Sequence, residues 1–221
     1  MAVSMASAHY TFSGLLINGE LVGDEWQYVR EHTRGYMPTF REEAATSKDF
    51  RCNLGASSGT YTGVYTVKAG DVVGLRQAFG AGGIEHPGPT QVYLSRAPDS
   101  VKDYDGSGDW IKCVWGENHI SFTVGDTIPD GEYLLRGEHT ALHGAHEGKA
   151  EFYYACAHIK VEGSTAASLP SESSTKIPGV YAVDDKAINF SIWGDSAEYD
   201  YVPGIKVSNG GQLSSITLYT I

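Results

Sequence analysis

The sequence has no long apolar run and no excess of positive charge. None of its apolar stretches approaches the roughly 18–20 residues that a membrane-spanning helix needs. Only 19% of the 221 residues are charged, and the formal net charge is −11, so the chain repels phosphate backbones and anionic lipid surfaces. We therefore exclude nucleic acid and membranes as partners. An uncharged polysaccharide meets no such electrostatic penalty.

Sustained helical periodicity is absent and cysteine is scarce. The chain instead holds 27 Gly, 14 Tyr and short runs rich in Val, Ile, Thr and Tyr, a composition that favours an antiparallel β protein. The three cysteines are Cys52, Cys113 and Cys156. An odd number fits a reduced cytosolic protein as well as a secreted protein with one disulfide and one free thiol.

The first residues resemble the end of a secretion signal. Ala6-Ser7-Ala8 is an A-x-A signal-peptidase site, and His9 follows it directly. The segment before this site is shorter than the charged and apolar regions of a working signal. We interpret residues 1–8 as the stub of a signal peptide, with a native tail as the alternative. We expect residues 9–221 to form a single domain of a secreted, extracellular protein.

Short strand-like runs separated by Gly, Pro and Asp turns recur along the chain. They predict a strand within 9–19, a hairpin over 61–77, and strands at 90–96, 110–115, 119–124, 132–139, 151–161 and 188–193. Residues 28–49 and the Ser-rich 164–175 are expected to be long surface loops, with no separate carbohydrate-binding module. The sequence thus predicts an all-β, antiparallel, immunoglobulin-like or fibronectin-like β-sandwich with long surface loops.

Three residues suggest a metal site. In the run 151–161, Tyr153 shares a face with small apolar residues and points inward, where its hydroxyl needs a partner. His86 precedes a proline, which restricts its backbone to extended conformations. If the chain is cleaved before His9, this residue offers its α-amine and a ring nitrogen. Three nitrogens in a plane with a weak axial oxygen suit copper better than zinc.

These residues belong to an ordered series of matches between His9 and about Val207. The matching stretches are HYTF at 9–12, DEWQYVR at 24–30, RCN at 51–53, HPGP at 86–89, DGSG at 105–108, GEYLLR at 131–136, HTALH at 139–143 and FY at 152–153. In this series the chain resembles the fungal lytic polysaccharide monooxygenases of auxiliary activity family 9.

The resemblance implies a function and a site. It implies one copper ion per chain, held by His9 and His86 with Tyr153 as the axial residue, and His143 beside the metal. Cellulose or a related β-1,4-glucan is then cleaved oxidatively at C1 or C4, with an external electron donor and hydrogen peroxide or dioxygen. The resemblance also implies a Cys52–Cys156 disulfide, with Cys113 free, and we expect a monomer.

The chain departs from the family at three places, one of which is its amino terminus. Glu151 stands two positions before Tyr153, where the family usually has Gln, and the strand period of two places it on the Tyr153 face. A carboxylate there adds charge near the metal, and its pKa should rise if it is buried. We expect activity to survive with an altered rate and pH dependence. The tail after Val207 also differs from the family's usual ending.

Several further residues have assignments from the sequence. Crystalline cellulose requires a flat site, for which Tyr28, with Tyr199 or Tyr201, is a candidate source of aromatic contacts. Asn189 begins a glycosylation sequon. The remaining histidines are expected to be surface or structural residues: His32, His119, His139, His146 and His158.

Two other functions remain open on the sequence alone. A glycoside hydrolase would need a pair of carboxylates, and no such pair stands out. A non-catalytic protein of the same fold would bind copper or carbohydrate without turning substrate over.

Overall fold

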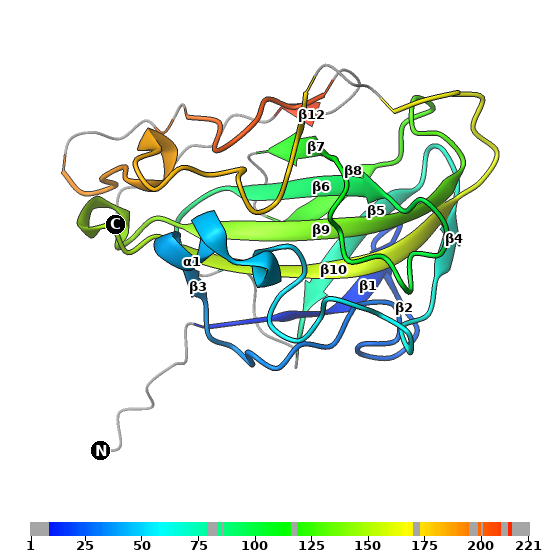
Figure 1. Cartoon of the computed structure of the whole chain (residues 1–221), viewed down its shortest axis with the longest axis horizontal. Coiled ribbons are helices and arrows are strands. Elements are labelled where there is room, and N and C mark those ends of the chain that lie inside the picture. The colour runs from blue at the N-terminus through cyan, green and yellow to red at the C-terminus, as the bar shows by residue number, and fades with distance from the viewer. Residues whose placement is uncertain are drawn as a thin grey trace.

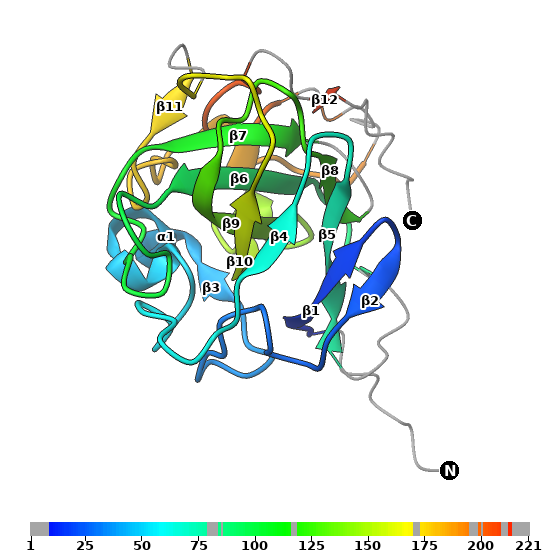
Figure 2. The same cartoon turned by 90° about the vertical axis from the view of Figure 1, so that its right-hand side faces the viewer.

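The fold consists of two β-sheets packed face to face. It is seen in a computed structural model that describes residues 9–78, 84, 86–115, 119–169, 173–194, 199 and 201–208, with the backbone of 212–213. Figure 2 shows the two sheets side by side, with the short helix α1 (Arg41–Thr46) on the outer side of the larger one. Among the described residues, no helix has the length and hydrophobicity of a membrane span.

The smaller sheet has the strand order β2-β1-β5-β8. Its strands are β1 (Phe12–Ile17), β2 (Glu20–Val22), β5 (Val72–Gln77) and β8 (Ile120–Thr123). All three of its pairings are antiparallel. This sheet forms one layer of the sandwich.

The larger sheet has the order β11-β7-β6-β9-β10-β3. Its strands are β3 (Thr39–Phe40), β6 (Thr90–Arg96), β7 (Trp110–Trp115), β9 (Gly131–Ala141), β10 (Glu151–Val161) and β11 (Ser174–Thr175). Two short strands, β4 (Tyr65–Val67) and β12 (Gln212–Leu213), add parallel pairings to β10 and β7. The long central strands run along the molecule in Figure 1. The predicted antiparallel sandwich is confirmed.

The space between the sheets is filled by apolar side chains of alternating strand positions. Tyr153, Ala155, Ala157, Ile159 and Val161 point from β10 into this core, as the strand period predicts. The sheets approach so closely at Gly137 that a Cβ there would lie 2.4 Å from Ile120 Cγ2.

The outer face of the larger sheet is also buried, although no third sheet covers it. Phe152, Tyr154 and Cys156 of β10 pack there in a second core with Phe50 and Tyr181. The cover consists of α1, loops, and the 3₁₀ helices Lys48–Phe50 and Lys186–Ile188. The strand β10 is therefore enclosed on both faces.

Three sequence predictions need correction. Residues 61–77 do not form a hairpin, because β4 pairs with β10 in the larger sheet while β5 joins β1 and β8 in the smaller one. Residues 188–193 are not a strand. There the Asp185 side chain accepts a hydrogen bond from Ala187 N and starts the 3₁₀ helix Lys186–Ile188. The predicted loop 28–49 contains β3 and α1.

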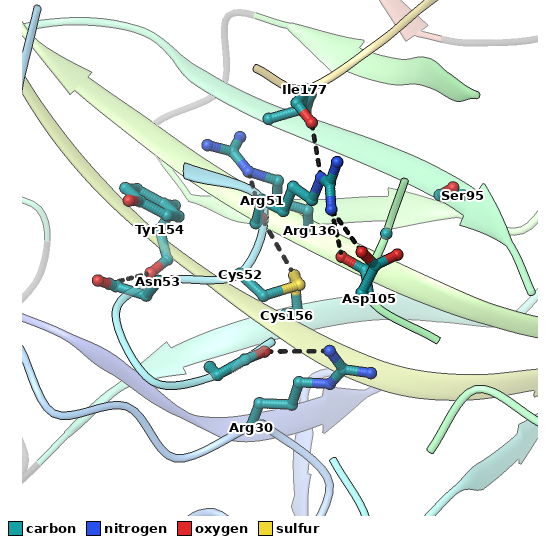
Figure 3. The surroundings of a disulfide bond; sticks show 12 residues. Arg30, Arg51, Cys52, Asn53, Ser95, Asp105, Arg136, Tyr154, Cys156 and Ile177 are labelled. Atoms are coloured by element: carbon teal, nitrogen blue, oxygen red, sulfur yellow. Dashed lines mark hydrogen bonds and ion pairs between the residues drawn. A yellow bond between two sulfur atoms is a disulfide. The ribbon is translucent and has the colours of Figure 1, made fainter. Parts of the chain in front are cut away.

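Cys52 and Cys156 form a disulfide that ties the loop after Phe50 to the middle of β10. Figure 3 shows two arginine side chains nearby, Arg30 and Arg136, which reach the loop backbone. Cys113 is buried and free, as expected, and desolvation raises the pKa of its thiol to about 12. Its thiolate is therefore strongly disfavoured.

Candidate metal centre

Segments far apart in the sequence bring His9, His86 and Glu151 together at one end of the sandwich. His9 lies just before β1, His86 lies in the turn before β6, and Glu151 begins β10. One ligand atom from each of these three residues lies within 4.8 Å of the other two. The ring centroids of His9 and His86 are 6.2 Å apart. The convergence of the two predicted histidine ligands is thus present in the structure.

Tyr153 lies beneath this cluster, with its ring centroid 6.2 Å from that of His9 and 5.8 Å from that of His86. Its side chain is 2% exposed. The hydroxyl donates a hydrogen bond of 2.6 Å to Glu151 Oε2. Burial, and then the neighbouring carboxylate, raise the pKa of Tyr153 well above its ordinary value, so the phenol stays protonated.

Glu151 is the hub of the polar contacts. Its Oε1 lies 3.5 Å from His143 Nε2, and its Oε2 lies 3.9 Å from His86 Nε2. The ring of His143 stacks on that of His86 with centroids 4.5 Å apart. The placement of Glu151 on the Tyr153 face, within reach of His143, is confirmed.

The turn that carries His86 is held against the end of β9. Leu142 N donates to Pro87 O at 2.9 Å, and Thr140 N donates to Pro89 O at 2.9 Å. A Cβ on Gly88, whose φ is +149°, would lie 1.9 Å from Thr140 O, so only glycine fits this approach. The turn is therefore fixed by β9 rather than by its own sequence alone.

Two buried residues behind the site escaped the functional assignments. Tyr10 stacks on Tyr153 with ring centroids 4.3 Å apart, and its hydroxyl forms a hydrogen bond with His139 Nδ1. Desolvation lowers the pKa of His139 to about 3, so its imidazole is neutral. His139 is structural, as expected, but it lies directly against the candidate ligands.

The donor set could hold a metal ion. Ligand atoms of His9, His86 and Glu151 lie within 4.8 Å of one another, and the Tyr153 hydroxyl is hydrogen-bonded to Glu151. Imidazole is a ligand that copper accepts, so the two histidines are compatible with copper. In the printed sequence the His9 nitrogen is part of a peptide bond, so its α-amine becomes available only after cleavage behind Ala8.

Comparison with known proteins identifies the family. The sequence model of Auxiliary Activity family 9, formerly GH61, matches residues 9–201. The chain belongs to this family. It is 42% identical to AA9 family lytic polysaccharide monooxygenase G of Aspergillus tamarii, over 96% of this chain and 69% of that protein. It is 41% identical to monooxygenase A of Aspergillus fumigatus, over 99% of this chain and 82% of that protein.

Solved structures of AA9 proteins have the same fold. The extended catalytic domain of H. jecorina LPMO9A superposes with a TM-score of 0.78 at 20% identity, covering 96% of this chain and 98% of that one. The crystal structure of HiLPMO9B gives a TM-score of 0.75 at 23% identity, covering 91% and 100%. The sandwich architecture is therefore that of the AA9 family.

The structure does not place most of the predicted substrate-contact tyrosines of this AA9 chain on the surface beside the candidate metal site. Tyr199 is buried in the outer core against Phe190, where its hydroxyl donates to Ala187 O. Tyr28 is half-buried against Tyr65, next to the far part of β10 rather than next to Glu151. Tyr201 is 37% exposed and stays a candidate for substrate contact.

Two exposed aromatic residues lie closer to the candidate metal site formed by His9, His86 and Glu151. Trp193 donates its indole N–H to His143 O at 2.9 Å. Phe40 pairs with Glu151 across the β3–β10 ladder. Neither position was singled out from the sequence, since Trp193 was assigned to a strand and Phe40 to a loop.

The Asn189 amide is engaged within the protein. Its Nδ2 donates to Val183 O and Asp185 O, and its Oδ1 accepts from Arg41. A glycan on Nδ2 would displace both donated bonds. Glycosylation at this sequon stays a prediction, and the folded geometry argues against it.

Proposed function

We propose that this AA9 chain, once His9 is its first residue, is a copper-dependent lytic polysaccharide monooxygenase that cleaves cellulose or a related β-1,4-glucan. The reaction is oxidative, at C1 or C4, and draws on an external electron donor with hydrogen peroxide or dioxygen. The observation that carries the proposal is the convergence of His9, His86 and Tyr153 at one end of the sandwich.

The residues that would hold copper follow from their donor atoms. When copper is bound, His9 would contribute its freed α-amine and a ring nitrogen, His86 would contribute a ring nitrogen, and Tyr153 would contribute its phenol oxygen. Bound copper supplies the one-electron redox chemistry that the protein side chains lack. Tyr153 serves as a weak neutral ligand because its phenol keeps its proton.

The chain's own groups then control protons beside the metal. Glu151 accepts the hydrogen bond of Tyr153 through Oε2, and its Oε1 faces His143 Nε2. His143 and Glu151 together can hold a proton next to the ligands. Replacing Glu151 with Gln keeps an acceptor for Tyr153 and removes the charge, so we expect a changed turnover rate with unchanged product identity.

The surface around the site suits an uncharged, extended substrate. The exposed rings of Trp193 and Phe40 lie beside His143 and Glu151. Aromatic faces pack on sugar rings without needing charge. We further propose secretion, action as a monomer, and a small reductant or a redox enzyme as the electron donor.

The experiment uses protein secreted so that cleavage exposes His9, with the terminus verified by sequencing. Copper-loaded protein is incubated with cellulose and a small reductant, and products are analysed for aldonic acids and C4 ketones. Oxidised chain ends that depend on reductant support the proposal. A His86→Ala variant and a form with one residue before His9 should both lose them by at least about a hundredfold, since each removes a metal ligand.

The same assay separates the rival functions. Reductant-independent products without oxidised ends would indicate a hydrolase. The metal cluster, however, contains a single carboxylate, Glu151, among the described residues. Binding of copper and cellulose without any products would indicate a non-catalytic member of the family.

A further inference from the structure

Tyr10 and His139 form a buried pair directly behind the candidate ligands. Tyr10 is 5% exposed, His139 is fully buried, and the two share a hydrogen bond between the phenol oxygen and Nδ1. Tyr10 is joined to His9 by a single peptide bond. Whatever holds the Tyr10 ring therefore also restricts where the backbone of His9, including its nitrogen, can lie.

His139 also contacts the segment that carries the second histidine ligand. In the sheet register it lies between Tyr153 on β10 and Thr90 on β6. The residue after His139 binds the same turn, since Thr140 N donates to Pro89 O at 2.9 Å. His139 therefore lies between the strands that carry the candidate site.

The rings behind the site form one packed group. His139 stacks on Tyr153, with ring centroids 6.3 Å apart. The Tyr10 ring in turn stacks on Tyr153 and lies 5.9 Å, centroid to centroid, from His86.

We propose that His139 is a positioning residue that sets the separation of the two copper-binding histidines, acting through Tyr10, which follows His9 in the chain and whose ring lies against His86. The proposal rests on the proposed function, because it assumes that His9 and His86 hold copper. Partners that orient metal ligands typically change metal affinity by about 10–100-fold when they are lost. We expect a value near the lower end, because His139 acts on His9 through an intervening residue.

The test compares Tyr10→Phe, His139→Leu and His139→Asn in protein that begins at His9. Copper(II) affinity is measured by competition with a chelator, and the copper environment by electron paramagnetic resonance. Tyr10→Phe and His139→Leu should each weaken copper binding about tenfold and alter the hyperfine splitting. His139→Asn places an amide near the former Nδ1 position and should restore most of the affinity. The double variant Tyr10→Phe/His139→Leu should be little worse than His139→Leu alone, because both changes break one bond.

His158→Leu is the matched control. His158 is equally buried on the neighbouring strand β10, but it binds Arg30 instead of a residue at the site. It should lower the melting temperature and leave the copper affinity and spectrum unchanged. The inference is overturned if Tyr10→Phe and His139→Leu behave like this control while the parent binds copper. If the parent itself fails to bind copper, the proposed function falls as well, and the two failures are thereby distinguished.

Discussion

The two faces of the larger sheet are buried in different ways. The inner face packs on the smaller sheet through apolar side chains, and the candidate metal site lies at one end of this face. The outer face is covered by loops and short helices, and its buried polar residues include the ion pair Arg136–Glu138 and the pair Arg30–His158. The disulfide also lies on this outer side (Figure 3).

The difference follows from backbone hydrogen bonding. Strands satisfy one another's N–H and C=O groups, whereas loops packed on a sheet bring carbonyl groups that no ladder pairs. Arg136 donates to the carbonyls of Phe50 and Arg51. Arg30 donates to the carbonyls of Ala56, Val101 and Tyr104. The loops that cover the outer face are therefore held by buried arginine side chains and by a disulfide. The inner face is held by the packing of apolar side chains between the two sheets.

Removing the disulfide, which lies on the outer face, should lower the stability of the protein more than any other change. Cys52→Ala/Cys156→Ala opens a loop with a sequence separation of 104 residues. The free energy of unfolding should fall by about 4–5 kcal/mol, measured by guanidinium titration. The copper spectrum should stay that of the parent, because the bond lies on the face away from the site. If the copper spectrum changed while the free energy of unfolding did not, the disulfide would act on the metal site and not on the stability of the outer face.

Breaking the buried ion pair should have the next largest effect. Glu138→Leu leaves the Arg136 guanidinium buried without its carboxylate and should cost about 3 kcal/mol of unfolding free energy in thermal or denaturant melts. Arg136→Met/Glu138→Leu removes both charges and should recover part of that loss. If the double variant is less stable than Glu138→Leu alone, the loop carbonyls bound by Arg136 matter more than the pair.

One buried histidine on each face should give acid sensitivity of equal size. Desolvation lowers the pKa of His139 on the inner side and of His158 on the outer side to about 3, against about 6.5 when unfolded. Between these values the unfolded chain binds more protons, so the free energy of unfolding falls as the pH falls. Each histidine should lower the free energy of unfolding by about 1.6 kcal/mol between pH 6.5 and 5. His158→Gln should flatten the pH profile of stability by that amount, and an unaltered slope would contradict the assignment.

Sequence reasoning succeeded where a strand repeats its pattern. The bounds of β6, β7 and β10 are those predicted, and the period of two correctly placed Glu151 beside Tyr153. Sequence reasoning failed for residues 61–77. The sequence of a tight turn between two strands is the same whether the strands pair with each other or belong to different sheets. His9 was singled out by the cleavage site before it and His86 by the proline after it, and the family resemblance then supported both.

The parts of the site that were missed depend on how the outer cover folds. Trp193 reaches His143 only because the segment after the 3₁₀ helix Lys186–Ile188 turns back toward the end of β9. Tyr199 belongs to the buried outer core, and its residue type alone does not reveal this. The link from Tyr10 to His139 spans 129 residues and carries no local signal.

Trp193 provides the smallest and most specific test, because it is the point where the outer cover meets the site. Trp193→Phe keeps an aromatic ring and removes the N–H that donates to His143 O. The loss of one hydrogen bond, about 0.5–1 kcal/mol, should weaken cellulose binding about 2- to 5-fold through looser placement of the ring. Adsorption isotherms without reductant measure this, with Trp193→Ala expected to bind more weakly still. If Trp193→Ala adsorbs to cellulose like the parent, the Trp193 ring does not contact the substrate. The loops of the outer face would then contribute to the stability of this enzyme and not to its contact with the polysaccharide.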